Sequence, residues 1–369
     1  MIPLRPAPAS QGPEESPEEQ KLERAVDRSF ALPASALVGA AFMVVLVALV
    51  SASTGAAALP VGGVVTTFLD RLPGVSMASS LSEQQQAILL QIRLPRMVLG
   101  MLVGASLGMA GAAFQGVFRN PLADPYLLGV SAGAGFGAVL ALGFGLDLGW
   151  GPFAAVPAAA FIGALFAVTA SALVARGSFS APATLLLSGV AMAALFSAAQ
   201  TFALSKLDET RAREVLSWLF GRLATSGWDQ VVLLGPYVLV CGGVLVAHRR
   251  HLDVLRVGDD EARAVGLDPP RSRLVVIMAA TLLTAAAVSV SGLIAFVGLV
   301  VPHLVRLVAS HSYRVIVPMS ALLGAALLAG VDVGARTLVA PAELPVGVIT
   351  ALVGAPVFAI VLRRSGKGA

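Results

Sequence analysis

Hydrophobic positions dominate the chain in long runs that short polar stretches separate. A helix needs about 20 apolar residues to cross a hydrocarbon core of about 30 Å, and most runs after residue 33 approach that length. Because backbone polar groups in lipid must bond within the protein, runs of this kind predict membrane-spanning helices. Ten helices are expected, at about 33–57, 94–116, 126–145, 152–175, 181–204, 229–247, 273–291, 296–309, 315–331 and 344–362.

The composition excludes a soluble globular domain. Of 369 residues, 57% are hydrophobic and only 12% are charged, and the mean hydropathy is +0.86. The sole cysteine, Cys241, lies in an apolar run, so neither a disulfide framework nor a cysteine metal site is expected. The basic residues are scattered and form no patch with aromatics, which argues against nucleic acid as a partner. The predicted fold class is therefore an all-α polytopic membrane protein in contact with lipid.

The start of the chain differs from the rest. Residues 1–29 are polar, proline-rich and of mixed charge, which predicts a disordered cytoplasmic arm. Arg24 and Arg28 before the first apolar run imitate a secretory signal, but the run is much longer than the 7–15 residues typical of such signals. We therefore expect it to be the first span of one transmembrane domain, residues 30–369.

The distribution of arginine predicts the topology. Loops rich in Lys and Arg face the cytoplasm, and an even number of spans places both termini on one side. The richer set of loops includes the N-terminal arm, the segment 248–273 and the C-terminal end. We therefore expect a multi-pass protein of the cytoplasmic membrane with both termini in the cytoplasm.

In this topology the external basic residues include three arginines at the mouths of helices: Arg93, Arg96 and Arg336. They have no obvious partners in the sequence, and guanidinium groups suit carboxylates, so they indicate a docking surface for an acidic partner. The alternative is that they extend toward lipid phosphates. Asp332 is four residues before Arg336, and the two side chains are expected to pair on one helical face.

The longest polar interruption, 248–273, contains a short predicted helix in the stretch GDDEARAVGL. Acidic residues fill its first turn, Asp259 or Asp260 is near the N-cap, and Gly266 ends it. A capped helix between two spans is a rigid knob that another protein can grip. No GxxxxGK[ST] motif occurs in the chain, so ATP hydrolysis by that route is not expected of it.

Two other function classes remain as alternatives. GVSAG at 129–133 fits the nucleophile-elbow pattern around Ser131, with His303 as its base in an intramembrane serine protease. That elbow requires a strand before the helix. Ser131 also lies on the second of two predicted glycine ridges with four-residue spacing, which let helix backbones approach closely: Gly100, Gly104 and Gly108, and Gly129, Gly133 and Gly137. A proton-coupled secondary transporter would carry carboxylates in the middle of its spans, and nearly every run lacks them.

Several segments resemble the FecCD-type permease family. They are RLPR at 93–96, RNPLADP at 119–125, FVGLVVPH at 296–303 and ELPVGVITALVGAP from residue 343. The resemblance extends from about Leu90 to Arg364. Members of this family are the membrane subunits of type II ABC importers for ferric siderophores, haem or cobalamin.

The resemblance implies a set of partners: a second permease subunit in a homodimer or paired homologue, two ABC ATPase subunits that hold ATP and Mg, and a periplasmic or lipid-anchored substrate-binding protein. It implies a bacterial cytoplasmic (inner) membrane location, no enzyme activity, cofactor or metal on this chain, and a ferric siderophore as first cargo, before cobalamin or haem. Arg93, Arg96 and Arg336 match the docking arginines. The family's ATPase-coupling segment matches Gly258, Asp259, Asp260, Glu261, Ala262, Arg263, Gly266 and Leu267.

The pathway and gate are less defined by the resemblance. A cobalamin importer of this family narrows its pathway with hydroxyl side chains at the start of the fifth helix, where this chain has Ala181, Pro182 and Ala183. Ser180 or Thr184 is therefore the expected hydroxyl substitute. Met109, Phe114 and Gln115 are the expected pathway residues.

Overall fold

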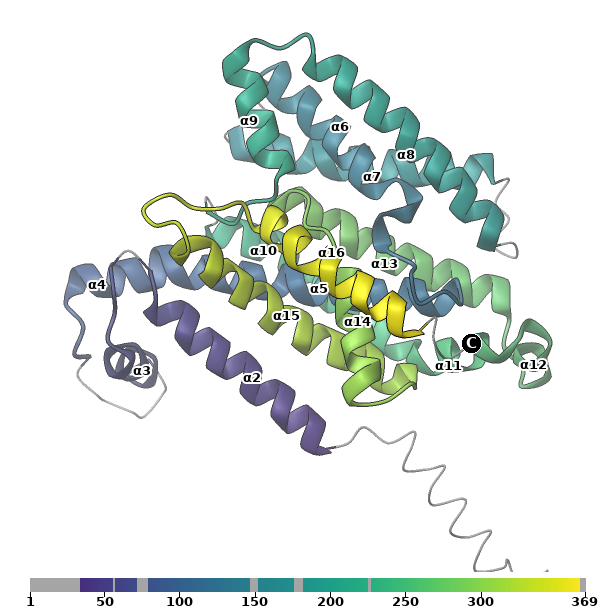
Figure 1. Ribbon diagram of the computed structural model, residues 1–369, viewed down its shortest axis with the longest axis horizontal. Coiled ribbons are helices and arrows are strands. Elements are labelled where there is room, and N and C mark those ends of the chain that lie inside the picture. Colours follow the sequence, from purple (N-terminus) through teal and green to yellow (C-terminus); the bar gives the residue numbers. More distant parts are fainter. Residues whose placement is uncertain are drawn as a thin grey trace, which may run out of the picture.

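The computed structural model describes residues 34–55, 57–71, 79–146, 152–175, 182–224 and 227–365. Within these ranges every regular element is a helix, which confirms the all-α membrane fold (Figure 1). The predicted N-terminal arm, 1–29, lies outside the described residues. The ten apolar helices are α2 (Ala34–Ser53), α5 (Leu94–Val117), α6 (Val130–Gly143), α7 (Pro152–Val174), α8 (Pro182–Leu204), α10 (Trp228–Ala247), α13 (Pro269–Ser291), α14 (Val297–Val308), α15 (Tyr313–Thr337) and α16 (Val346–Ser365).

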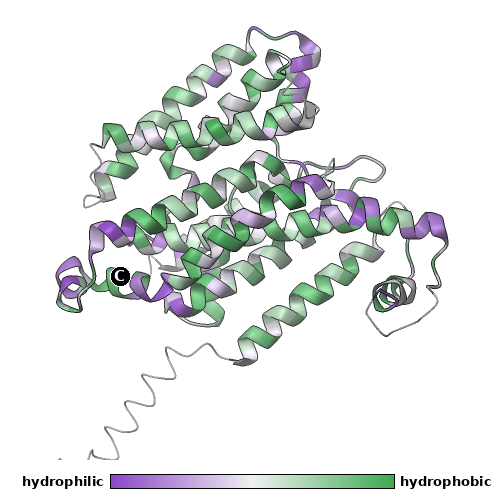
Figure 2. Ribbon diagram, turned by 180° about the vertical axis from the view of Figure 1, so that it is seen from behind, coloured by the Kyte–Doolittle hydropathy of each residue, from purple (hydrophilic) through white to green (hydrophobic). Residues whose placement is uncertain are grey.

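These ten helices coincide with the ten predicted ones. Among the described residues, seven candidate spans are long and apolar enough to cross a membrane, while α6, α14 and the apolar part of α16 are shorter. Hydrophobic residues follow the middle of the helices, and hydrophilic residues gather at the two ends of the bundle (Figure 2). This distribution is typical of a protein whose bundle axis crosses a bilayer.

Six shorter helical elements were not predicted as separate elements, although η2 overlaps the start of the predicted span 126–145. They are α3 (Val61–Leu69), α4 (Glu83–Ala87), the π-helix η1 (Ile88–Arg93), the 3-10 helix η2 (Pro125–Leu128), α9 (Glu209–Leu219) and α11 (Arg249–Val257). Their sequences are too short or too polar to span a membrane, so hydropathy alone gives them no signal. α9 begins conventionally, because the Asp208 carboxylate accepts a hydrogen bond from the Arg211 amide at 3.0 Å.

α5 lies at the centre of the bundle. In an apolar 18-residue stretch of the span that contains α5, 78% of the residues are buried, whereas in the corresponding stretches of α8 and α10 only 22% are buried. α13, α14 and α15 pack around α5, and α2 lies along α15, while α6 to α9 form a neighbouring group (Figure 1). The poorly buried helices therefore provide the surface left for lipid or a second subunit.

Glycines allow α5 to approach α15 very closely. A methyl group at Gly104 would collide with the carbonyl oxygen of Gly324, and one at Gly108 would collide with that of Ser320. The predicted ridge is therefore confirmed at these two positions, because small residues let helix backbones touch. Gly100, expected in the same ridge, faces only the side chain of Leu223.

The second predicted ridge joins α6 to α7. A methyl group at Gly133 would meet the carbonyl oxygen of Gly163, and one at Gly137 would meet that of Ala159. Gly129, expected to belong to this ridge, instead has a φ of +84° and forms the turn between η2 and α6. A left-handed backbone of this kind favours glycine, so Gly129 serves the turn and not the helix contact.

Candidate functional site

An ion-pair cluster lies where α5 begins and α15 ends. The guanidinium of Arg96 donates from Nε and Nη2 to Oδ1 of Asp332, at 3.0 and 2.8 Å. Asp332 also pairs with Arg336 one helical turn later, at 3.1 Å, which confirms the predicted pairing of these two residues. The residues Arg96, Asp332, Arg336 and Glu343 are called the Asp332 cluster below.

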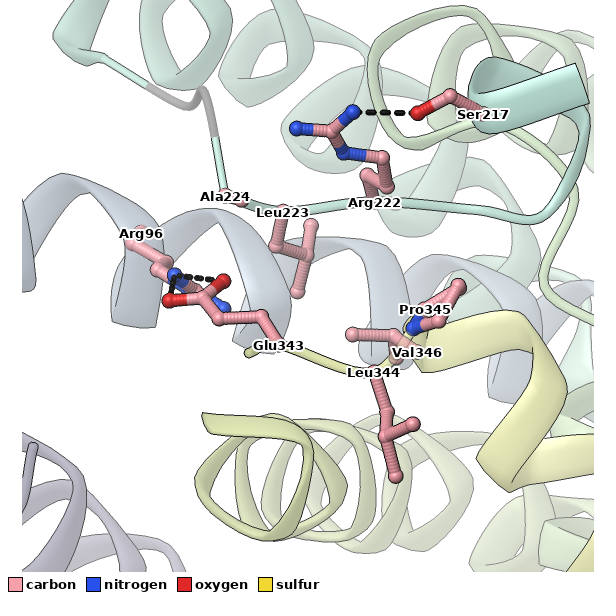
Figure 3. Close-up of a pocket in the computed structure, with 9 residues that line it drawn as sticks. All are labelled: Arg96, Ser217, Arg222, Leu223, Ala224, Glu343, Leu344, Pro345 and Val346. Atoms are coloured by element: carbon pink, nitrogen blue, oxygen red, sulfur yellow. Dashed lines mark hydrogen bonds and ion pairs between the residues drawn. The ribbon is translucent and has the colours of Figure 1, made fainter. Parts of the chain in front are cut away.

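Glu343 is the outermost member of this cluster. Its carboxylate pairs with Nη1 of Arg96 at 3.0 Å, and 41% of its side chain is exposed, against 2% for Asp332. Arg96 and Glu343 line a pocket of about 420 Å³, with Arg222 on the opposite side (Figure 3). The name Arg96–Arg222 pocket is used below for this cavity.

Arg336 and Arg93 have a different task, because both bind the end of α2. Arg336 donates from Nη2 to the Ser51 hydroxyl at 2.9 Å and from Nη1 to the Thr54 carbonyl at 3.2 Å. Arg93 donates from Nη1 to the Ala52 carbonyl at 2.8 Å. The last carbonyls of a helix lack partners within the helix and carry partial negative charge, so two arginines cap α2.

The prediction of three unpaired external arginines is therefore wrong in one respect. Arg93 and Arg96 are buried, at 6% and 8% exposure, and all three guanidinium groups bond within the chain. Burying an arginine without acceptors is costly, so each one at this helix end has been supplied with carbonyls or carboxylates. Arg96 also lines a pocket; the role of these three arginines in docking stays a prediction.

A second ion-pair cluster lies beyond the opposite end of α5. Asp259, the first residue of α12 (Asp259–Ala264), pairs with Arg119, which follows α5, and with Arg273 at the start of α13. Nη1 of Arg273 donates to Oδ2 of Asp259 at 2.9 Å. Arg119 also donates from Nε to the Leu255 carbonyl at 2.6 Å, near the end of α11. Arg119, Asp259 and Arg273 are called the Asp259 cluster below.

The charge state of Asp259 is fixed by its partners. The hydrogen bonds from Arg273, and secondarily from Arg119, hold the pKa of this carboxyl below its usual range. Arg273 is 1% exposed, so its carboxylate partner compensates a buried positive charge. Asp259 therefore stays ionised at neutral pH and ties α12 to α5 and α13.

α12 is the short helix predicted between the spans. Its N-cap is Gly258, one residue before the predicted aspartates, and the acidic residues Asp259, Asp260 and Glu261 fill its first turn. Gly266, with a φ of +81°, ends it: its amide donates to the Arg263 carbonyl and that of Leu267 to the Ala262 carbonyl, both at 2.9 Å. This pair of hydrogen bonds is the usual termination of a helix by glycine.

The predicted coupling residues divide into two faces of α12. Ala262 is fully buried, and Asp259 is engaged in its cluster. Asp260, Glu261 and Arg263 are exposed, and so is Val265 at 71%. A protein that touches this helix therefore meets mixed charge, with one exposed apolar side chain, Val265, at its C-terminal end.

α11 fastens this exposed helix to a third span. Asp253 on α11 accepts hydrogen bonds at 2.7 Å from the Ser312 hydroxyl and from the Tyr313 amide, at the start of α15. Arg256 donates to the His311 carbonyl at 2.9 Å. Static contacts thus join α11 and α12 to α5, α13 and α15.

The predicted pathway residues are buried in the core of the chain. Met109 is 4% exposed, and Phe114 and Gln115 are each 1% exposed. Gln115 accepts from Arg306 at 2.5 Å and donates weakly to the Leu299 carbonyl at 3.4 Å. Packing accounts for all three, and the geometry gives no support to a pathway role in this conformation.

The predicted gate positions fall at the start of α8. Ser180 and Ala181 lie outside the described residues. Pro182 opens the helix, and Ala183 and Thr184 are exposed. Thr184 is therefore the first described hydroxyl on this helix that is open to the surroundings.

The protease alternative lacks its structural context. Ser131 is in the first turn of α6, and the segment before it is the 3-10 helix η2, not a strand. A nucleophile elbow needs the strand-turn-helix geometry to present its serine. Asp332, a carboxylate near one end of a span, is held between two arginines, unlike a carboxylate poised to exchange protons.

Comparison with known proteins assigns the family. The FecCD transport family matches residues 46–364. The chain is 42% identical over 322 residues, 83% of its length and 85% of the relative's, to the cobalamin import system permease protein BtuC of Halobacterium salinarum. It is 38% identical to the hemin transport system permease protein HmuU of Yersinia pestis, over 78% of this chain and 86% of that one.

A solved structure agrees with these matches. A putative metal-chelate type ABC transporter in an inward-facing conformation superposes with a TM-score of 0.78 at 31% identity, covering 89% of this chain and 98% of that chain. An uncharacterized ABC transporter permease protein, YvrB of Bacillus subtilis, is 39% identical over 91% of this chain and 95% of its own length. The chain belongs to the FecCD transport family.

Proposed function

We propose that this chain is the membrane permease subunit of an ATP-driven importer of metal chelates. The observation that carries the proposal is the structural match to a putative metal-chelate type ABC transporter. Its TM-score is 0.78, and it covers 98% of the matched chain. Residues 30–369 form the permease domain in this proposal. The chain supplies the passage through the membrane and contains no ATPase motif of the P-loop type.

The two ends of the bundle support two kinds of partner. The exposed face of α12, with Asp260, Glu261 and Arg263, is the proposed contact with an ABC ATPase subunit on the cytoplasmic side. Arg96 is the proposed contact with the acidic surface of a binding protein on the external side. Arg93 and Arg336 support Arg96 by fixing the end of α2 beside it.

A second permease subunit completes the proposed assembly. α8, α10 and α16 expose large apolar side chains, including Leu187 at 72%, Leu239 at 78% and Leu352 at 70%. Such surfaces face either lipid or another apolar helix. In the proposal, part of this surface pairs with a second copy or a homologue, and both termini are cytoplasmic.

The cargo is proposed as a metal chelate, with a ferric siderophore first. The names of similar permeases include cobalamin, hemin and Fe(3+)-citrate systems at comparable identity, so similarity alone does not rank these classes. The common feature is a bulky chelate that encloses its metal. The described residues accordingly need not contain a metal-ligating group for the cargo to pass.

The proposal is tested by ATPase activity of the chain assembled with its ATPase subunit in lipid nanodiscs. Binding proteins loaded with cobalamin, haemin or a ferric siderophore are added one at a time. One of them is expected to stimulate hydrolysis, and Glu261→Ala with Arg263→Ala is expected to abolish the stimulation. The matched control is Glu209→Ala with Arg213→Ala, an exposed pair of the same types on α9. Cargo uptake by the chain without any ATPase would contradict the proposal.

A further inference from the structure

The Arg96–Arg222 pocket contains one carboxylate of the chain itself. We infer that this pocket is the binding site for an acidic side chain of the docking protein, and that Glu343 occupies it until the partner's carboxylate displaces it. The inference rests on the proposed function and adds two residues to it, Glu343 and Arg222. Neither was predicted as a docking residue.

The two acids that bind Arg96 are unequal, and this inequality identifies the one that leaves. Asp332 takes Nε and Nη2 of Arg96 and is buried with 2% of its side chain exposed. Glu343 takes only Nη1 and is 41% exposed. Asp332 thus keeps Arg96 oriented with its charge compensated, while water already reaches the Glu343 contact. Exposed ion pairs contribute little free energy, so exchange of this one is easy.

Arg222 supplies the second positive charge. Its guanidinium donates to the Ser217 hydroxyl, and across the described ranges no carboxylate forms an ion pair with it. The Arg222 amide donates to the Ser291 carbonyl at 2.8 Å, which fixes its backbone at the end of α13. Arg222 therefore adds positive charge to the lining of the pocket, with its guanidinium directed toward Ser217 on the other side of the backbone 222–224 from Arg96 and Glu343 (Figure 3).

The backbone around Glu343 allows its side chain to leave without refolding. The Leu344 amide donates to the Ala335 carbonyl at 3.0 Å, which anchors the residue next to it on α15. Glu343 itself belongs to no helix, so its long side chain rotates about a fixed backbone. A tethered carboxylate competes with a free one at high effective concentration, so Glu343 weakens docking and hastens release.

An acidic protein side chain is the occupant that this chemistry favours. The guanidinium of Arg96 matches the planar oxygens of a carboxylate, which its contact with Glu343 already demonstrates, and Arg222 adds a second positive charge to the pocket lining. The pocket volume of about 420 Å³ admits a side chain such as glutamate from a neighbouring surface. Charge complementarity of this kind raises the rate of encounter between the two proteins, and this increase becomes smaller as the salt concentration rises.

The test measures affinity of the full permease and ATPase complex in nanodiscs. The probes are binding proteins loaded with cobalamin, haemin or a ferric siderophore, compared at low and high salt. Glu343→Gln removes the internal competitor and is expected to tighten binding about three- to fivefold, as the loss of an exposed ion pair allows. Glu209→Gln, which removes an equal charge outside the pocket, is the matched control and is expected to change affinity less than twofold.

A gain of affinity in Glu343→Gln is not produced by misfolding, which makes the result clear. Arg222→Gln is expected to weaken binding and to reduce its salt dependence, while Arg213→Gln on α9 leaves both unchanged. If the wild type binds one probe and Arg96→Gln weakens it, but Glu343→Gln does not tighten it, the inference fails and the proposed function stands. If neither the wild type nor Glu343→Gln binds any probe, both fail.

Discussion

The two clusters at the ends of α5 share a centre of one aspartate and two arginines and differ in their surroundings. In each, one of the two arginines comes from a distant part of the chain, Arg96 for Asp332 and Arg119 for Asp259. Asp332 has a side chain that is 2% exposed, and both of its arginines are below 10%. Asp259 is 26% exposed, and its two arginines differ widely, at 37% for Arg119 and 2% for Arg273.

This difference in exposure indicates that the Asp332 cluster is a fixed joint between helices, whereas the Asp259 cluster is an adjustable one. Charges removed from water lose several kcal/mol of hydration each, so a cluster resists losing a member that is buried. A cluster partly in water exchanges its contacts at low cost, because water replaces a departing group. The Asp332 cluster therefore fixes α2, α5 and α15 together, whereas the Asp259 cluster links α12 to the bundle through a contact that can adjust.

α5 connects the two joints. Arg96 is in its first turn, and Arg119 follows its last residue by two positions. The helix between them is packed by glycine against α15, so it transmits displacement as a rod. A force applied at α12 therefore reaches the Asp332 cluster through packed backbone, and four changes test this comparison.

The largest effect is expected from Asp332→Asn. The change leaves Arg96 and Arg336 buried without their shared negative charge, and breaking a buried pair costs about 3–5 kcal/mol. The expected result is a large loss of folded protein and of thermal stability, measured by the unfolding transition in detergent.

The control for this change is Glu343→Gln on the same cluster. Because Glu343 is 41% exposed, its loss is expected to cost less than about 1 kcal/mol. Equal destabilisation by the two variants would show that the Asp332 cluster is not closed to water, which removes the distinction drawn above.

The next effect is expected from Gly104→Ala, in the rod itself. The added methyl group collides with the Gly324 carbonyl oxygen and forces α5 away from α15. Overpacking of this kind costs about 1–3 kcal/mol. Gly39→Ala is the matched control, since a methyl group there meets nothing within 4 Å; a stable Gly104→Ala variant with normal coupling would exclude the rod.

Much of this fold could be predicted from hydropathy, because each long helix is recorded in its own sequence as an apolar run. The same reasoning missed α9 and α11, which are amphipathic and lie outside the apolar runs. Gly129 shows a further limit: its four-residue spacing from Gly133 indicates a ridge, yet the backbone places it in a turn. Spacing does not reveal where a helix begins.

The sites were predicted less completely, and distance along the chain is the reason. Asp259 and the end of α12 follow from local capping signals within ten residues. Arg96 and Asp332 are 236 residues apart, so only the packing of α5 on α15 brings them together. The Asp332–Arg336 pairing was found because both residues lie on one helix. The role of Arg93 in capping α2 had no local signal.

A smaller effect on stability is expected from Asp259→Asn in the adjustable cluster. Because the site is partly in water, the loss is expected to be about 1 kcal/mol, while α12 separates from α5 and α13. Stimulated ATPase activity is therefore expected to fall more than stability does. Glu209→Gln on α9 is the control, because it removes an exposed acid (81%) outside the α12 contact; equal effects of both variants on stimulation would show that the loss of a negative charge, and not the attachment of α12, is responsible.

The smallest effect is expected from a change of pH on the free energy of unfolding. The pH at which this effect occurs identifies the ionisable group that attaches α12 to the bundle. Arg273 and Arg119 lower the pKa of Asp259 from its ordinary value of 3.8, so its contribution to stability is present above that value and is lost as the pH falls through the lower folded value. The difference in free energy of unfolding between wild type and Asp259→Asn is therefore expected to stay constant from about pH 8 to 5.

A histidine on α11, His251, is the alternative to Asp259 as the group that sets this pH dependence, because it precedes the Asp259 cluster closely in the sequence. His248 and His251 stack edge to face at 5.0 Å, and burial lowers the pKa of His251 from 6.5. A lowered pKa means that His251 gains its proton, and any effect on the joint, only at pH values below 6.5. If the wild-type to Asp259→Asn difference changes between pH 6.5 and 5, and His251→Gln removes that change, then the histidine and not the aspartate sets the strength of this joint.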